Sequence, residues 1–102
     1  MTLTEFLLAR IAEDEGHARK LLETDRRPVL SLASTVNHPA RLLAEVAAKR
    51  RIVALHEPSS HPMASWTNCR HCGAGRGYCA HLRLLASVYA DHADYDEAWQ
   101  HG

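Results

Sequence analysis

Apolar residues recur at helical spacing in three stretches of the chain, and this pattern predicts most of its secondary structure. The first stretch runs from Leu3 to about Glu23, where apolar side chains fall on an arc of about 100°. Its members are Leu3, Leu7, Ile11, Ala18, Leu21 and Leu22, with Phe6 beside them. Thr2 and Glu5 have the spacing of a capping box, which satisfies backbone N–H groups at a helix start. We therefore predict a first helix with a core-facing stripe.

A second helix is predicted over "ARLLAEVAAKRRIVALH", residues 40–56. Either Asn37 or His38 can cap its start, and Pro39 suits its first turn. It must end before Pro58, because the residue before a proline is disfavoured in the helical region.

A third helix is predicted from about Cys79, followed by an acidic tail. Its shared apolar face consists of Leu82, Leu85, Ala86 and Tyr89. In the tail, Tyr95 and Trp99 can pack back onto the body, whereas Asp91, His92 and Asp94 are interpreted as solvated charges at a helix end.

Two segments lack a helical pattern. We predict a loop with one or two helical turns for residues 24–37, and a loop for residues 58–78, where Pro, Ser, His, Asn and Gly dominate around Trp66. A loop of about 20 residues is unusual inside a compact domain unless something organises it.

Length and composition are typical of one small folded domain. The chain has 102 residues, of which 46% are hydrophobic and 24% charged. No apolar run reaches the roughly 18–20 residues needed to cross a membrane, and the N-terminus lacks the basic lead of a secretory signal. Three clustered cysteines without such a signal indicate a reducing, cytoplasmic location.

Charge is divided unevenly along the chain, although the formal net charge is zero. Residues 26–90 hold nine bases and two acids, while the segments before and after carry net charges of −3 and −4. The basic middle could attract nucleic-acid phosphates. The simpler interpretation is a solvated surface whose acidic ends neutralise its centre.

All three cysteines lie in "NCRHCGAGRGYCAH", residues 68–81. Cys69 and Cys72 have the spacing of a zinc knuckle, in which two thiolates converge on one ion. Cys79 follows at the predicted start of the third helix, where free N–H groups and the helix dipole favour a thiolate. We predict a structural Zn²⁺ site, since zinc prefers Cys and His ligands.

The fourth ligand is left open among four histidines and water. His56 is favoured because it ends the second helix on its apolar face, where a core histidine would otherwise face a hydrogen-bond acceptor. His61 lies in the loop, His71 lies between the knuckle cysteines, and His81 points about 200° round the helix from Cys79. With His56, one ion would join the second helix, the loop and the third helix.

Three segments carry a family resemblance: "ARLLAEVAAKRRIVALHEP" (40–58), the cysteine segment, and "LRLLASVYADHADYDEAW" (82–99). Together they resemble a family of small uncharacterised proteins of actinobacteria and their phages. The resemblance favours His56, Cys69, Cys72 and Cys79 as a set, and it implies no activity.

The sequence thus predicts a mainly α domain over residues 1–102, with three helices around a small core and a zinc-knuckle loop between the second and third. We expect a non-enzymatic interaction or regulatory module with a protein partner. The alternative is nucleic-acid binding through residues 26–90. A zinc-dependent hydrolase is disfavoured, because no carboxylate stands in a His-x-Glu motif near the cysteines.

Overall fold

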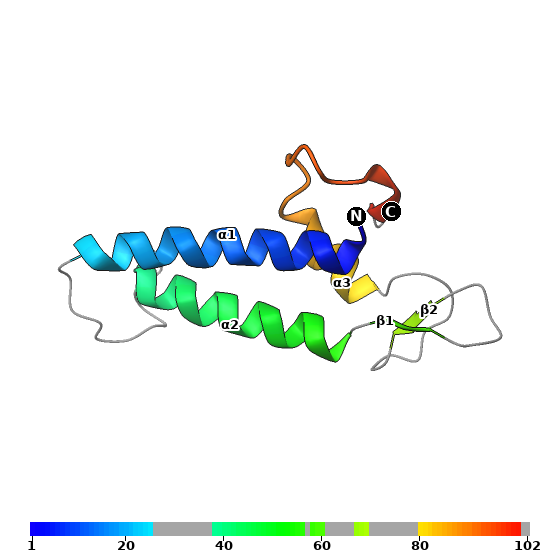
Figure 1. Cartoon of the computed structure of the whole chain (residues 1–102), viewed down its shortest axis with the longest axis horizontal. Helices are drawn as coiled ribbons and strands as arrows, with labels where there is room; N and C mark the ends of the chain where they lie inside the picture. Colours follow the sequence, from blue (N-terminus) through cyan, green and yellow to red (C-terminus); the bar gives the residue numbers. More distant parts are fainter. Residues whose placement is uncertain (26–37, 57, 61–66, 70–79, 101–102) are drawn as a thin grey trace.

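The computed structural model describes residues 1–25, 38–56, 58–60, 67–69 and 80–100, with 58–60 and 67–69 described as backbone only (Figure 1). Within these residues the protein is mainly helical, and its three α-helices confirm the mainly α part of the predicted fold class. The zinc-knuckle loop between the second and third helices stays a prediction. None of the described helices is both long and apolar enough to span a bilayer.

Helix α1 spans Leu3–Thr24 and begins at the predicted capping box. The Thr2 hydroxyl accepts a hydrogen bond from the Glu5 N–H at 3.1 Å, and the Glu5 carboxylate accepts one from the Thr2 N–H at 3.2 Å. Two backbone donors that a helix start leaves unpaired are thereby satisfied.

Helix α2 spans Pro39–Leu55 and runs antiparallel beside α1 (Figure 1). His38 is its N-cap, with Nδ1 accepting a hydrogen bond from the Ala40 N–H at 3.1 Å. Pro39 occupies the first turn, where its missing N–H costs nothing. Both features agree with the sequence prediction.

Helix α3 spans Ala80–Ser87, and a short 3₁₀ helix, η1, spans Glu97–Trp99. Figure 1 shows both elements beside the N-terminal end of α1, so the last described residues lie near the first. Strands β1, Pro58–Ser60, and β2, Thr67–Cys69, pair antiparallel with Ser59 opposite Asn68. The prediction of a loop over residues 58–78 is therefore wrong at these two strands.

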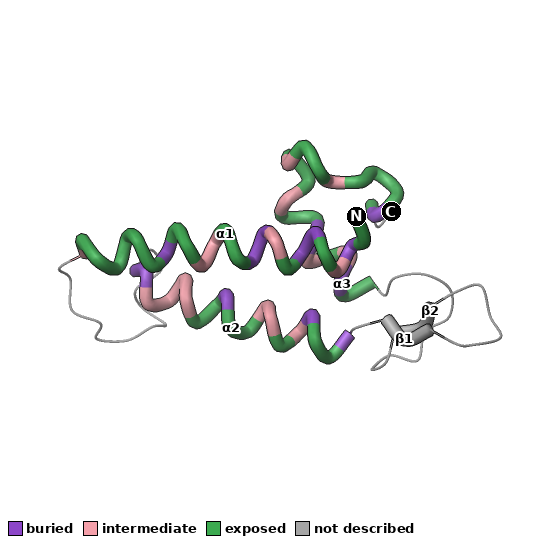
Figure 2. Tube along the Cα trace, in the orientation of Figure 1, coloured by how far each residue is buried: buried purple, intermediate pink, exposed green. Residues whose placement is uncertain are grey.

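The core lies where α1, α2, α3 and η1 meet. Its buried apolar members are Leu3, Phe6, Leu7, Ile11, Val46, Val53, Leu82, Ala86 and Trp99. Figure 2 shows that burial along α1 is concentrated in its N-terminal half. Burial of Trp99 confirms that the tail packs back onto the body.

Two predicted core residues of α1 are exposed instead. Leu21 and Leu22 are 39% and 41% exposed, although they share the helical arc of the buried leucines. Figure 1 shows the last turn of α1 extending past the first turn of α2, far from α3. The apolar periodicity of α1 continues into this last turn, but no other described helix packs over it.

Candidate metal centre

His56 lies at the junction of three elements. It is the C-cap of α2, and its N–H donates to the Ile52 carbonyl at 3.1 Å. The residue is 7% exposed, so its imidazole is withdrawn from solvent, as its place on the apolar face of the helix predicted. Strand β1 begins two residues later.

The imidazole of His56 stacks on that of His81, the second residue of α3. The ring centroids are 4.4 Å apart and the planes are inclined by 24°. A metal ion lies in the plane of the imidazole that binds it, about 2.0–2.1 Å from the nitrogen for zinc. Two stacked rings have separate, nearly parallel planes, so in this arrangement they do not share one ion. The stack therefore makes His56 and His81 alternative ligands rather than joint ones.

Cys69 ends β2 and is described by its backbone. It lies opposite Pro58 in the register of the hairpin, and Pro58 is two residues from His56. A cross-strand pair has a Cα separation of about 4.5–5.5 Å, and two residues span at most about 7 Å. The Cα atoms of Cys69 and His56 are therefore no more than about 13 Å apart.

The remaining predicted ligands, Cys72 and Cys79, lie outside the described residues, as do His61 and His71. Among the residues that are described, no group of three or more His, Cys, Asp or Glu side chains could hold a metal ion. The described part of the predicted site therefore lies at the ends of α2 and β2 and at the start of α3.

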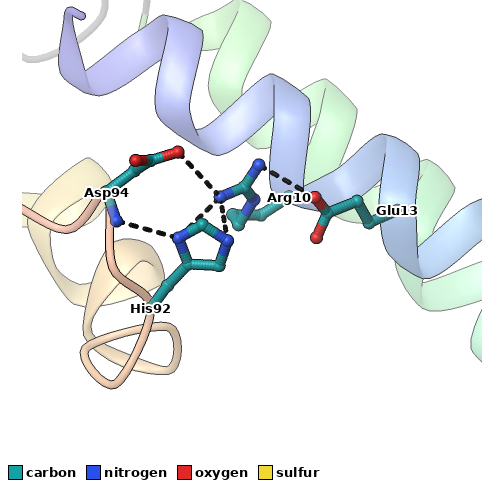
Figure 3. A network of polar contacts seen from close by, with 4 residues as sticks. All are labelled: Arg10, Glu13, His92 and Asp94. Carbon is teal, nitrogen blue, oxygen red and sulfur yellow. Dashed lines mark hydrogen bonds and ion pairs between the residues drawn. The ribbon is translucent and has the colours of Figure 1, made fainter.

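A second polar cluster surrounds Arg10, which the sequence prediction did not single out (Figure 3). Arg10 is 7% exposed, and its guanidinium bonds to the Glu13 carboxylate at 2.9 Å. It also donates to the ring of His92, with 2.8 Å between Arg10 Nη1 and Nδ1, and lies 3.7 Å from the Asp94 carboxylate. His92 is therefore half-buried rather than solvated, whereas Asp94, whose side chain is 55% exposed, stays in contact with solvent as predicted. The sequence did contain one signal for this cluster, because Arg10 is a charged residue between Leu7 and Ile11, inside the apolar arc of α1.

A family model described as a family of unknown function (DUF6221) matches residues 1–101. The chain belongs to this family. No curated protein and no solved structure matches it. The resemblance to an uncharacterised family is thus confirmed, while an origin in actinobacteria or phages stays a prediction.

In this DUF6221 domain the phenol of Tyr89, two residues after the end of α3, contacts both α1 and α2. The Tyr89 hydroxyl donates a hydrogen bond to the Asp14 carboxylate of α1 at 2.7 Å. The same hydroxyl oxygen accepts one from the Lys49 ammonium of α2 at 3.4 Å. Burial, followed by the bond to Asp14, raises the pKa of Tyr89 far above its ordinary value. The phenol therefore stays neutral and acts as a positioning group.

Carboxylates neutralise part of the basic middle of the DUF6221 domain. Arg41 pairs with Glu45 at 3.3 Å along α2, and Arg50 reaches across to Glu15 of α1. The Arg50 hydrogen bond lowers the pKa of Glu15 below its ordinary value. Cations engaged in this way offer less charge to a phosphate backbone.

Proposed function

We propose that this DUF6221 protein is a non-enzymatic zinc domain whose Zn²⁺ is held by His56, Cys69, Cys72 and Cys79. The ion joins α2, the β1–β2 hairpin and α3, and so stabilises a module that binds a protein partner or regulates one. The thiolates require a reducing compartment, in agreement with a cytoplasmic protein.

The observation that carries the proposal is the position of His56. A histidine that caps a helix, is withdrawn from solvent, and is followed within two residues by a strand paired to Cys69 is suited to bind an ion between those elements.

The ligand chemistry favours a structural role over catalysis. A Cys₃His set closes the four tetrahedral positions of zinc, whereas catalytic zinc keeps one position open for water. The ion then contributes its binding free energy to folding. In this arrangement His81 covers the face of the His56 ring and limits its rotation.

Native mass spectrometry of the reduced protein tests the proposal. We expect one zinc per wild-type chain, lost on treatment with a chelator and lost in His56→Ala. His81→Ala keeps its zinc, because His81 covers the ligand without binding the ion. His17→Ala, which changes an exposed histidine of α1, serves as the matched control.

Two results would contradict the proposal. A wild-type chain purified without zinc that also fails to bind added zinc has no such site. Zinc retained by His56→Ala and lost from His81→Ala would transfer the ligand role to the exposed ring of the stack. Circular dichroism of each variant separates loss of the ion from loss of the fold.

A further inference from the structure

Helix α1 carries a second stripe of residues, which meets the apolar arc at Leu22 and which we call the outer stripe. It comprises Leu8, Ala12, Glu15, Arg19 and Leu22, spaced alternately by four and three residues. This is the spacing at which one helix presents a continuous seam to another. Leu8 and Leu22 are 44% and 41% exposed, so the seam has apolar side chains in contact with water.

Hollows lie at both ends of the outer stripe. Beside Leu8, a hollow of about 170 Å³ is lined by Thr4 and Leu8 of α1 and by Arg50, Val53 and Ala54 of α2. Beside Leu22, a more open one is lined by Arg19, Leu22 and Glu23. Each exposed leucine thus borders a space that an apolar side chain from another helix can enter.

The two leucines of the outer stripe lie symmetrically about Glu15. Leu8 precedes Glu15 by seven residues and Leu22 follows it by seven, which is close to two helical turns in each direction. When two copies of α1 cross antiparallel with a two-fold axis at Glu15, Leu22 of one copy lies against Leu8 of the other. A two-fold interface requires this kind of self-complementary surface. We propose that the protein forms a homodimer through the outer stripe of α1, with Leu22 entering the hollow beside Leu8 and Val53 of the second copy.

The charges of the outer stripe are compatible with this pairing. Glu15 accepts a hydrogen bond from Arg50 of its own chain, and Arg19 lies 3.7 Å from it with a side chain that is 66% exposed. In the antiparallel arrangement Arg19 passes the small side chain of Ala12 and approaches Glu15 of the second copy. The two Glu15 carboxylates, one from each copy, then lie near the two-fold axis. Arg19 and Arg50 of both copies surround them and offset their repulsion.

The size of the face predicts a weak dimer. From Thr4 to Leu22 helix α1 is about 27 Å long, and two adjacent helices are about 20 Å wide. Each copy then buries on the order of 540 Å², or roughly 1,100 Å² for the pair, at the small end of specific interfaces. Association is therefore expected to depend on concentration.

Sedimentation equilibrium over a wide concentration range, in reducing buffer, tests the dimer. We expect the average mass of the wild type to rise from 11.4 kDa towards twice that value. Leu8→Glu and Leu22→Glu each weaken association at least about tenfold, because either change removes two apolar contacts per dimer. Leu84→Glu, at a 55% exposed leucine of α3 outside the outer stripe, associates like the wild type.

Three outcomes would overturn the dimer. The first is a wild type that stays monomeric at the highest concentration. The second is that the Leu8→Glu and Leu22→Glu variants associate as strongly as the wild type. The third is association that disappears when a chelator is added. The last outcome would assign self-association to the metal centre. Circular dichroism establishes that each variant is folded.

Discussion

Phe6 holds the residues that follow α3, 88–100, against α1, and we call them the C-terminal segment. Its ring is fully buried and lies edge-on or tilted to three aromatic side chains of that segment, with centroid distances of 6.2 Å to Tyr89, 6.0 Å to Tyr95 and 5.1 Å to Trp99. The imidazole of His92 is 5.8 Å away. Such pairs add roughly 0.5–1.5 kcal/mol each beyond the burial of apolar area. One residue of the first helical turns therefore determines where the last residues lie.

We expect Phe6→Ala to lower the free energy of unfolding by about 3–5 kcal/mol, since a cavity remains where the ring was. That is a large part of the roughly 5–15 kcal/mol typical of a small domain. Urea unfolding followed by circular dichroism measures the loss. Leu84→Ala, at an exposed position, is the control and should change stability by less than about 0.5 kcal/mol. A Phe6→Ala loss no larger than that of the control would contradict this account of the core.

At the scale of elements, the α1–α2 hairpin combines apolar contact with a cross-helix ion pair. Val46 and Val53 bury against α1, while Arg50 and Glu15 join the two helices at the edge of that contact. A half-exposed ion pair adds little stability by itself. The stabilising contribution of this ion pair does, however, depend on pH.

The lowered pKa of Glu15 predicts the sign of that response. A carboxyl group whose pKa is lower in the folded state stabilises the protein above its ordinary pKa, and the contribution disappears as pH falls through the folded value. We therefore expect Glu15→Gln to have a lower melting temperature than the wild type at neutral pH, and the difference to vanish in acid. Calorimetry at several pH values measures it, with Glu23→Gln as the control at an exposed site. A difference that persists or grows in acid would exclude the proposed pairing.

At the scale of the whole molecule, the C-terminal segment closes onto the helix that begins the chain. Arg10 joins the two through His92 and Asp94 (Figure 3). Tyr89 joins them through Asp14. A buried guanidinium that lost these acceptors would be costly, so the segment and Arg10 depend on each other.

We expect Arg10→Met to loosen this closure, because it keeps an unbranched side chain but removes the guanidinium that lies over the Phe6 ring and contacts His92 and Asp94. Hydrogen exchange of the amides of residues 92–99 should become faster, with little change at the centre of α2. Lys20→Met, at an exposed position of the same helix, should leave both regions unchanged. Equal acceleration throughout the protein would show that Arg10 supports the whole fold rather than this closure.

The helices could be predicted from the sequence because their causes are local. The capping box of Thr2 and Glu5, the proline at the start of α2, and the apolar periodicity act within a few residues of each helix. The hairpin of Pro58 with Cys69 has no comparable local signal, since strand pairing depends on residues that are distant along the chain. Of the candidate metal centre, the position of His56 on the apolar face was predictable for the same local reason as the helix that carries it.

Tertiary packing alone decided which apolar positions became core. Leu7 and Leu22 both lie on the apolar arc predicted for α1, yet Leu7 is buried and Leu22 is exposed, because Leu22 lies in the last turn of the helix, which extends past α2 and is far from α3. The stack of His56 on His81 and the contacts of Arg10 with His92 likewise join residues far apart in sequence. The sequence by itself determined the helices, their caps and the candidate ligands. Only the folded chain decided which of these residues contact one another, because burial and polar contacts depend on neighbours that the apolar periodicity does not specify.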